Sequence, residues 1–128
     1  MSLAPDGGLL IEGNVQLSGD LTVRNLVVLD EIKAPKVLAE KLNIKTGETD
    51  DAGKSKDSIG TAKIDAGQTE IVVETTAVTD KSKVFVTATT STGSQSIYVS
   101  EQTDKEGFTV KLDQPLTTDV KFNWWVVN

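Results

Sequence analysis

The first third of the chain carries a short hydrophobic repeat. Between residues 9 and 44, an apolar residue, any residue and a second apolar residue recur seven times, with starts spaced by 6, 6, 6, 5, 5 and 5 positions. Side chains two positions apart lie on the same face of a strand. The pattern therefore predicts seven three-residue strands, with turn formers such as Gly13, Asn14 and Gly19 between the early ones.

Strands this short, joined by two or three residues, predict a chain that winds rather than one that forms hairpins. Two geometries stay open: a single-chain solenoid and a triple β-helix built by three chains. Seven triplets complete only about two coils of a solenoid, whereas stable arrays need roughly three repeats. We therefore favour a homotrimer, in which the triplets bury against their symmetry copies. The side chains expected at the subunit interface are Leu17, Leu21, Val23, Val27, Leu29, Ile32, Val37 and Leu42.

Residues 35–43 have an alternative prediction, which is a short helix. Pro35 suits the first helical position, and the Lys, Glu, Ala and Leu residues that follow favour helices. In a helix, Val37, Leu38 and Leu42 would lie near one face. Both the helix and the β-helix stay open for this stretch.

A polar segment follows the repeat. Residues 46–58 contain no large apolar side chain, and such a segment cannot bury enough surface to be ordered by itself. We interpret it as a linker or exposed loop. The predicted organisation is a shaft at residues 1–45, a linker at 46–58 and a head module at 59–128.

The polar segment also contains two weak motifs. Gly53-Lys54-Ser55 is reminiscent of a P-loop, but the first glycine that this motif requires would be position 48, which is Glu48. Three aspartates at positions 50, 51 and 57 lack the alternating spacing of a calcium loop. We therefore predict neither a nucleotide nor a metal site here.

The C-terminal part alternates between apolar runs and turn residues. Thr and Val, which favour pleated sheets, are abundant there. Regular turn signals predict an antiparallel β-sandwich or barrel, so the fold class is all-β. The predicted strands are 59–64, 69–75, 83–90, 95–100, 107–112 and 119–127.

Alternation along these strands assigns two faces. The predicted core face contains Ile64, Ile71, Val73, Val84, Val86, Ile97, Val99, Phe108, Val110, Leu112, Val120, Phe122, Trp124 and Val126. The opposite face is not uniformly polar, because Val72, Phe85, Tyr98, Trp125 and Val127 point there. Exposed apolar patches mark interfaces. Three interpretations stay open: subunit contact, an aromatic surface for a sugar built on Phe85, Tyr98 and Trp125, and ordinary two-sided burial.

Composition narrows the range of functions. The chain has no His and no Cys, so it cannot build a Ser-His-Asp triad or a Cys/His metal site. Its net charge of −6 argues against nucleic acid. No signal peptide and no apolar run long enough to span a membrane is evident. We predict a protein that is not an enzyme, needs no cofactor and does not insert into membranes.

Two parts of the sequence resemble known proteins. The segment GNVQLSGDLTV at residues 13–23 is similar to β-helical shaft segments of phage tail fibres and bacterial surface fibres. The stretches GTA at 60–62, AGQT at 66–69, VFVT at 84–87 and FNWWVVN at 122–128 resemble a C-terminal module of repetitive bacterial surface proteins. The resemblance implies a trimeric shaft with a terminal head, used for attachment or trimer assembly. It also implies a location on a cell surface or virion, with this chain as a piece of a longer protein.

Overall fold

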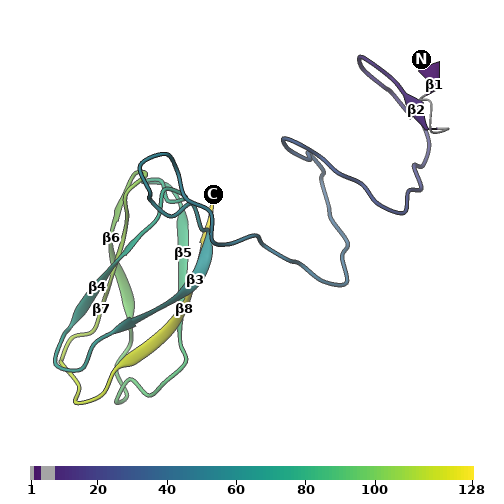
Figure 1. The fold of residues 1–128 in the computed structure, drawn as a ribbon. Coiled ribbons are helices and arrows are strands. Elements are labelled where there is room, and N and C mark those ends of the chain that lie inside the picture. The colour runs from purple at the N-terminus through teal and green to yellow at the C-terminus, as the bar shows by residue number, and fades with distance from the viewer. Residues whose placement is uncertain (1, 4–7) are drawn as a thin grey trace. The chain divides into compact units, whose positions relative to one another are not determined.

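The computed structural model describes residues 2–3 and 8–128, and it divides into two units, Met1–Ala39 and Glu40–Asn128. In the first unit, strands β1 (Ser2–Leu3) and β2 (Leu9–Leu10) form a two-stranded antiparallel ladder. The second unit contains the other six strands (Figure 1).

Beyond strand β2, which covers the start of the first triplet, the apolar repeat forms no sheet within a single chain. From residue 11 to residue 48, all of which the structure describes, the backbone has neither strand nor helix. The predicted three-residue strands and the single-chain solenoid are therefore wrong for the isolated chain. The alternative helix at residues 35–43 is wrong as well. A three-residue segment has too few backbone hydrogen bonds to define a strand unless a neighbouring segment pairs with it.

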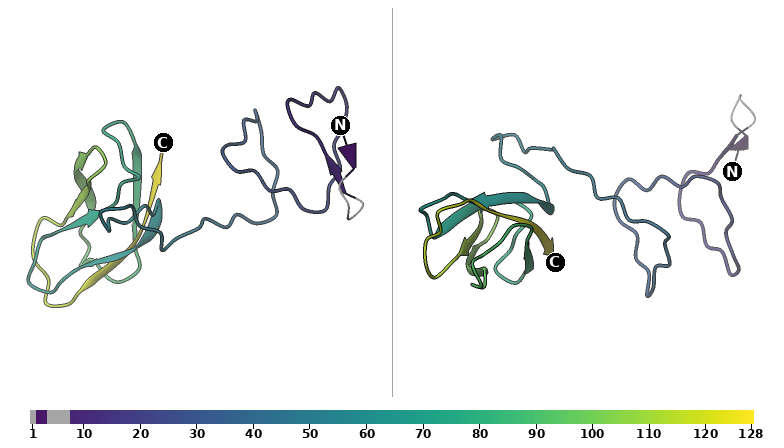
Figure 2. Two further views of the ribbon diagram at one scale, coloured as in Figure 1. Left: turned by 45° about the horizontal axis from the view of Figure 1, so that its top comes forward. Right: turned by 90° about the horizontal axis from the view of Figure 1, so that it is seen from below.

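The head is a sandwich of two three-stranded antiparallel sheets (Figures 1 and 2). The first sheet has the order β3-β8-β5, with β3 at Ile59–Ile64, β8 at Val120–Val127 and β5 at Lys83–Ala88. The second has the order β4-β7-β6, with β4 at Glu70–Glu74, β7 at Gly107–Lys111 and β6 at Tyr98–Thr103. The all-β prediction is confirmed, and the sheets are not closed into a barrel.

The sandwich core follows the predicted alternation. Strand β8 alternates buried and exposed residues along most of its length. All of the predicted core side chains are buried or pack against the buried cluster. The sequence patterns missed Val78, which lies in the β4–β5 connection and is fully buried. The fully or almost fully buried apolar residues are Ile64, Val73, Val78, Phe108, Val110, Leu112, Val120, Phe122, Trp124 and Val126.

Strand β6 begins three residues later than residue 95, where the pattern placed it. A bulge between Val99 and Glu101 shifts the register. After the bulge, the partly buried side chain is Gln102, whose amide donates to the carbonyl oxygens of Thr79 and Ser82 at 3.2 and 2.9 Å. The apolar alternation therefore stops inside the strand, because a hydrogen-bonded amide takes the place of an apolar residue.

The polar segment at residues 46–58 is an ordered turn in this structure. Thr49 and Ser55 form an isolated antiparallel bridge. The Asp50 carboxylate accepts the backbone N–H groups of Ala52 and Lys54 at 3.0 and 2.8 Å. The N–H of Gly53 donates to the Asp50 carbonyl at 3.0 Å. Amide groups that a P-loop would direct at phosphates are thus bonded within the turn.

The same segment is tied to the sandwich by backbone hydrogen bonds. The N–H of Thr76 donates to the Ser55 carbonyl at 2.9 Å, and the N–H of Val126 donates to the Ser58 carbonyl at 2.7 Å. The unit boundary between Ala39 and Glu40 agrees with this attachment. Residues 46–58 therefore belong to the head unit and do not form a free linker.

Candidate functional site

The eight side chains predicted for the subunit interface are all exposed in the single chain. Their exposed fractions run from 50% for Val23 to 98% for Leu29. Altogether, fifteen large apolar side chains between Leu9 and Leu42 are exposed. The described structure therefore provides no intramolecular partner that covers this apolar stretch. The eight predicted residues are Leu17, Leu21, Val23, Val27, Leu29, Ile32, Val37 and Leu42.

The second predicted surface is divided between the two sheets. Phe85 on β5 and Trp125 on β8 are cross-strand partners, with ring centroids 6.3 Å apart and a tilt of 41° between the rings. Tyr98 lies on β6 in the other sheet, where its hydroxyl is 3.3 Å from the Asp113 carboxylate. The three aromatic residues do not share a face, so a single platform built from all three is not formed.

Cross-strand register explains the aromatic pair. Ile59 on β3 and Phe85 on β5 both pair with Trp125 on the central strand β8. Directly opposed residues point to the same side of a sheet. Because Trp124 points into the core beside Phe108, Trp125 must point outward. Ile59, Trp125 and Phe85 therefore form one row across the outer face, which we call the apolar row.

Polarity changes in steps along this outer face. The next row, two residues away on each strand, is Thr61, Asn123 and Thr87, which are neutral and polar. The row after that contains the paired Lys63 and Lys121. Both β8 and β3 carry this order in their sequences, with Trp125, Asn123 and Lys121 on β8 opposite Ile59, Thr61 and Lys63 on β3. The surface therefore passes from the apolar row to a charged end at Lys63 and Lys121, and on the other side of the row Val127 pairs with Lys83.

An open pocket of about 410 Å³ lies over the apolar row. Its lining includes Phe85, Trp125 and Ile59 together with the residues of the neutral row, and Thr46 also lines it. A smaller pocket of about 250 Å³ is lined by Ile59 and Trp125 and by residues 42–44. Trp125 is thus shared by both pockets, and the last apolar triplet of the repeat, Leu42 and Ile44, lies beside it.

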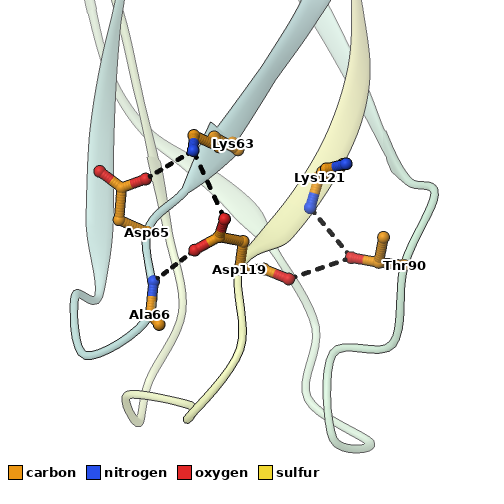
Figure 3. A network of polar contacts seen from close by, with 6 residues as sticks. All are labelled: Lys63, Asp65, Ala66, Thr90, Asp119 and Lys121. Atoms are coloured by element: carbon orange, nitrogen blue, oxygen red, sulfur yellow. Dashed lines mark hydrogen bonds and ion pairs between the residues drawn. The ribbon is translucent and has the colours of Figure 1, made fainter.

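The charged end is a hydrogen-bonded network (Figure 3). The ammonium group of Lys63 contacts the carboxylates of Asp65 and Asp119 at 3.3 and 3.4 Å. The other Asp119 oxygen accepts the N–H of Ala66 at 2.9 Å. The Thr90 hydroxyl accepts the N–H of Lys121 at 2.9 Å, and its contact with the Asp119 carbonyl is 3.4 Å. The network joins the β3–β4 turn to the beginning of β8.

Electrostatics in this network follow from those contacts. The hydrogen bond from Ala66, then the bond and charge of Lys63, lower the pKa of Asp119. The hydrogen bonds and charges of Asp65 and Asp119 raise the pKa of Lys63. Both changes favour the charged forms, so the groups hold the end of the sandwich together. All of these side chains are solvent-exposed, so the stabilisation is modest.

Metal and membrane chemistry find no support in the part of the chain that the structure describes. Within residues 2–3 and 8–128, no three acidic side chains gather into a group that could hold a metal ion. Over the same residues, no helix is long and apolar enough to cross a bilayer.

The chain matches no protein-family model, no curated protein and no solved structure. Function therefore has to be argued from these surfaces themselves.

Proposed function

We propose that this chain is the end module of a homotrimeric fibre that attaches a bacterial or phage structure to a surface outside the cell. Residues 1–45 of three chains would wind into a triple β-helical shaft, and residues 59–128 of each chain would form the head. The role is structural and not enzymatic. The observation that carries the proposal is the exposed, regularly spaced apolar repeat between residues 9 and 44.

Physical chemistry favours assembly for such a stretch. Apolar patches larger than a few hundred Å² are uncommon on soluble monomers and mark interfaces. Each Å² of apolar surface removed from water contributes about 25 cal/mol. Three copies around one axis would also supply neighbouring strands for the short segments, whose backbone groups then pair between chains. A symmetric trimer would thus cover the apolar side chains and pair the backbone groups that a single chain leaves exposed.

Molecular mass in solution tests the proposal directly. At micromolar concentration, sedimentation equilibrium or light scattering is expected to give three times the chain mass of 13.7 kDa. A stable species of one chain mass contradicts the proposal.

A matched pair of variants locates the interface in the repeat. Val23→Asp places a charge where three copies would meet, without a partner to offset its desolvation, and is expected to yield monomers. Thr22→Asp lies in the same triplet on the opposite face and is expected to leave the trimer intact. Near-ultraviolet circular dichroism of Trp124 against Phe108 reports whether the head is still folded in both variants.

A second candidate function is glycan binding by the head. The favouring observation is that Trp125 and Phe85 lie beside the amide of Asn123 and the hydroxyls of Thr61 and Thr87. An apolar ring surface with a few polar groups is typical of small-ligand sites. Affinity electrophoresis in polysaccharide gels tests this candidate. Retardation that is lost in Trp125→Ala, with unchanged melting, supports it, and migration unaffected by the gel polysaccharide contradicts it.

A further inference from the structure

The apolar row is covered on one side only. On the β3 side, the chain's own residues 42–44 lie against Ile59 and Trp125 and line the smaller pocket. The larger pocket, which is lined by all three strands of the sheet and reaches Phe85 on β5, stays open, with Phe85 57% exposed and Trp125 42% exposed. An apolar triplet of this chain therefore already contacts half of the row, and the other half lacks a comparable cover.

We propose that the open half, between Phe85 and Trp125, binds the Leu42–Ile44 triplet of a second copy of the chain. This inference rests on the trimer proposed above and assigns the head sheet β3-β8-β5 to the same interface as the repeat. Each triplet would then lie between the row of its own head and the row of the neighbouring head. The contact is heterologous, and three of them close a ring.

Rotational symmetry allows this triplet to reach the open pocket. Rotation about an axis leaves equivalent residues at the same level along that axis. Within the head unit, Leu42 and Ile44 lie beside Trp125. If the axis runs along the repeat, the neighbour's Leu42 and Ile44 lie at that level too. They are therefore apolar side chains of a second copy that can reach the open pocket without a shift along the fibre.

Chemistry matches this occupant better than a glycan. The row and the triplet are both apolar, and Asn43 between the two apolar residues is neutral, so no buried charge is created. The two rings are tilted by 41° and present no common plane to a flat sugar face. Polar groups of Thr61, Asn123 and Thr87 border the row on one side, and Val127 with the paired Lys83 borders it on the other. The row is therefore better suited to packing than to a network of hydrogen bonds.

Cysteine cross-linking tests the contact, because the chain has no cysteine of its own. The double variant Leu42→Cys/Phe85→Cys replaces two exposed side chains, so the core is untouched. Under oxidised glutathione, a disulfide forms where the Cα atoms approach within about 7 Å. A near-complete shift from monomer to covalent trimer on a denaturing, non-reducing gel is expected. Reduction should restore the monomer band.

The matched control is Leu42→Cys/Val72→Cys. Val72 is 58% exposed, close to the value for Phe85, and lies on β4 in the opposite sheet. This control is expected to stay monomeric on the same gel. Each single variant is expected to give no covalent trimer, because one thiol per chain links at most two chains.

Each other outcome overturns the inference for a distinguishable reason. A monomer band without free thiols means that the triplet of the same chain covers Phe85. Free thiols in a protein that light scattering shows to be trimeric mean that the row lies outside the interface, which leaves the glycan candidate. A variant and wild type that are both monomeric in solution refute the trimer itself.

Discussion

Residues 9–44 and residues 59–128 both alternate apolar side chains, yet beyond the short strand β2 at Leu9–Leu10 only the second region forms sheets. In the head, each strand has at least one antiparallel neighbour in the same chain, and Ile64 or Phe122 can be buried almost completely. In the repeat, Leu29 is 98% exposed and Val27 is 82% exposed. Both regions contain regularly spaced apolar side chains. They differ in whether the same chain supplies a neighbouring strand and a second layer that can cover those side chains.

The difference shows what alternation encodes. A period of two specifies which side chains can share a face, but burial of that face requires a second layer. Runs of five to eight residues in the head are long enough to pair with neighbours through hairpins and crossovers. Triplets separated by two or three residues cannot do this within one chain. The repeat therefore leaves its apolar face uncovered in the single chain, which is the basis of the proposed assembly, whereas the head specifies a fold.

Removal of a buried aromatic ring from the head should cause the largest loss of stability among the substitutions that compare the two regions. Phe122 on β8 is fully buried among residues from both sheets. Phe122→Ala is expected to lower the free energy of unfolding by about 3–5 kcal/mol. Because small domains are stable by only about 5–15 kcal/mol, much of the head should unfold. Urea unfolding followed by tryptophan fluorescence measures the loss.

The contrasting substitution is Leu29→Ala in the repeat. It removes a similar apolar volume from a side chain that is almost fully exposed in the single chain. In a monomeric background such as Val23→Asp, it is expected to leave head unfolding within about 0.5 kcal/mol of the parent. A large loss there would show that the repeat packs on the head of its own chain.

The head was largely predictable from its sequence. Alternation placed β3 correctly from Ile59 to Ile64 and identified the inward residues of β8. It failed where local chemistry replaced an apolar residue, as at Gln102, whose amide serves two carbonyl groups. It also failed at Val78, because a single buried valine in a connection has no periodic neighbours. Both failures depend on contacts with residues far away in the sequence, which a local pattern of apolar residues cannot predict.

The candidate surface was predictable only in part. Alternation correctly placed Phe85 and Trp125 on the side of their strands away from the core. It could not say that Tyr98 belongs to the other sheet, because strand order depends on the crossover connections. The row that includes Ile59 follows from register across β8, which a single strand does not reveal. Side-chain direction was thus readable from sequence, and sheet membership was not.

After Phe122→Ala, a substitution at Gly107 should cause the next largest loss of head stability. A Cβ atom there would lie 2.2 Å from the carbonyl oxygen of Val73 on the neighbouring strand β4. The backbone of β4 or β7 must therefore shift, and overpacking of this kind costs about 1–3 kcal/mol. Gly107→Ala is expected to lower the melting temperature clearly. Gly67→Ala, where no atom lies within 4 Å of the added Cβ but φ is +82°, separates the effect of close approach from that of backbone strain.

Gly60→Ala should have a smaller effect confined to one ring. The added Cβ would lie 2.8 Å from the Trp124 indole, which can rotate or shift where a backbone carbonyl cannot. The expected result is a weakened near-ultraviolet circular dichroism signal from the Trp124–Phe108 edge contact, whose ring centroids are 5.4 Å apart. An unchanged signal together with unchanged melting would show that the core accommodates the extra methyl group without moving Trp124.

The smallest expected effect is a pH dependence at the charged end of the head. The Ala66 N–H bond and Lys63 lower the folded pKa of Asp119 below its ordinary value of 3.8. A carboxylate with a lowered folded pKa contributes stability that is present above the ordinary pKa and is lost as pH falls through the folded pKa. Asp119→Asn is therefore expected to reduce the melting temperature slightly at pH 7, and this difference is expected to shrink as pH falls through the folded pKa of Asp119. Measured melting curves for the variant and wild type should converge as pH falls below 3.8.

Asp104→Asn, a change in the β6–β7 turn, controls for the loss of one negative charge. If the two curves stay parallel as pH falls, the charge of Asp119 is not the source of the difference in melting temperature.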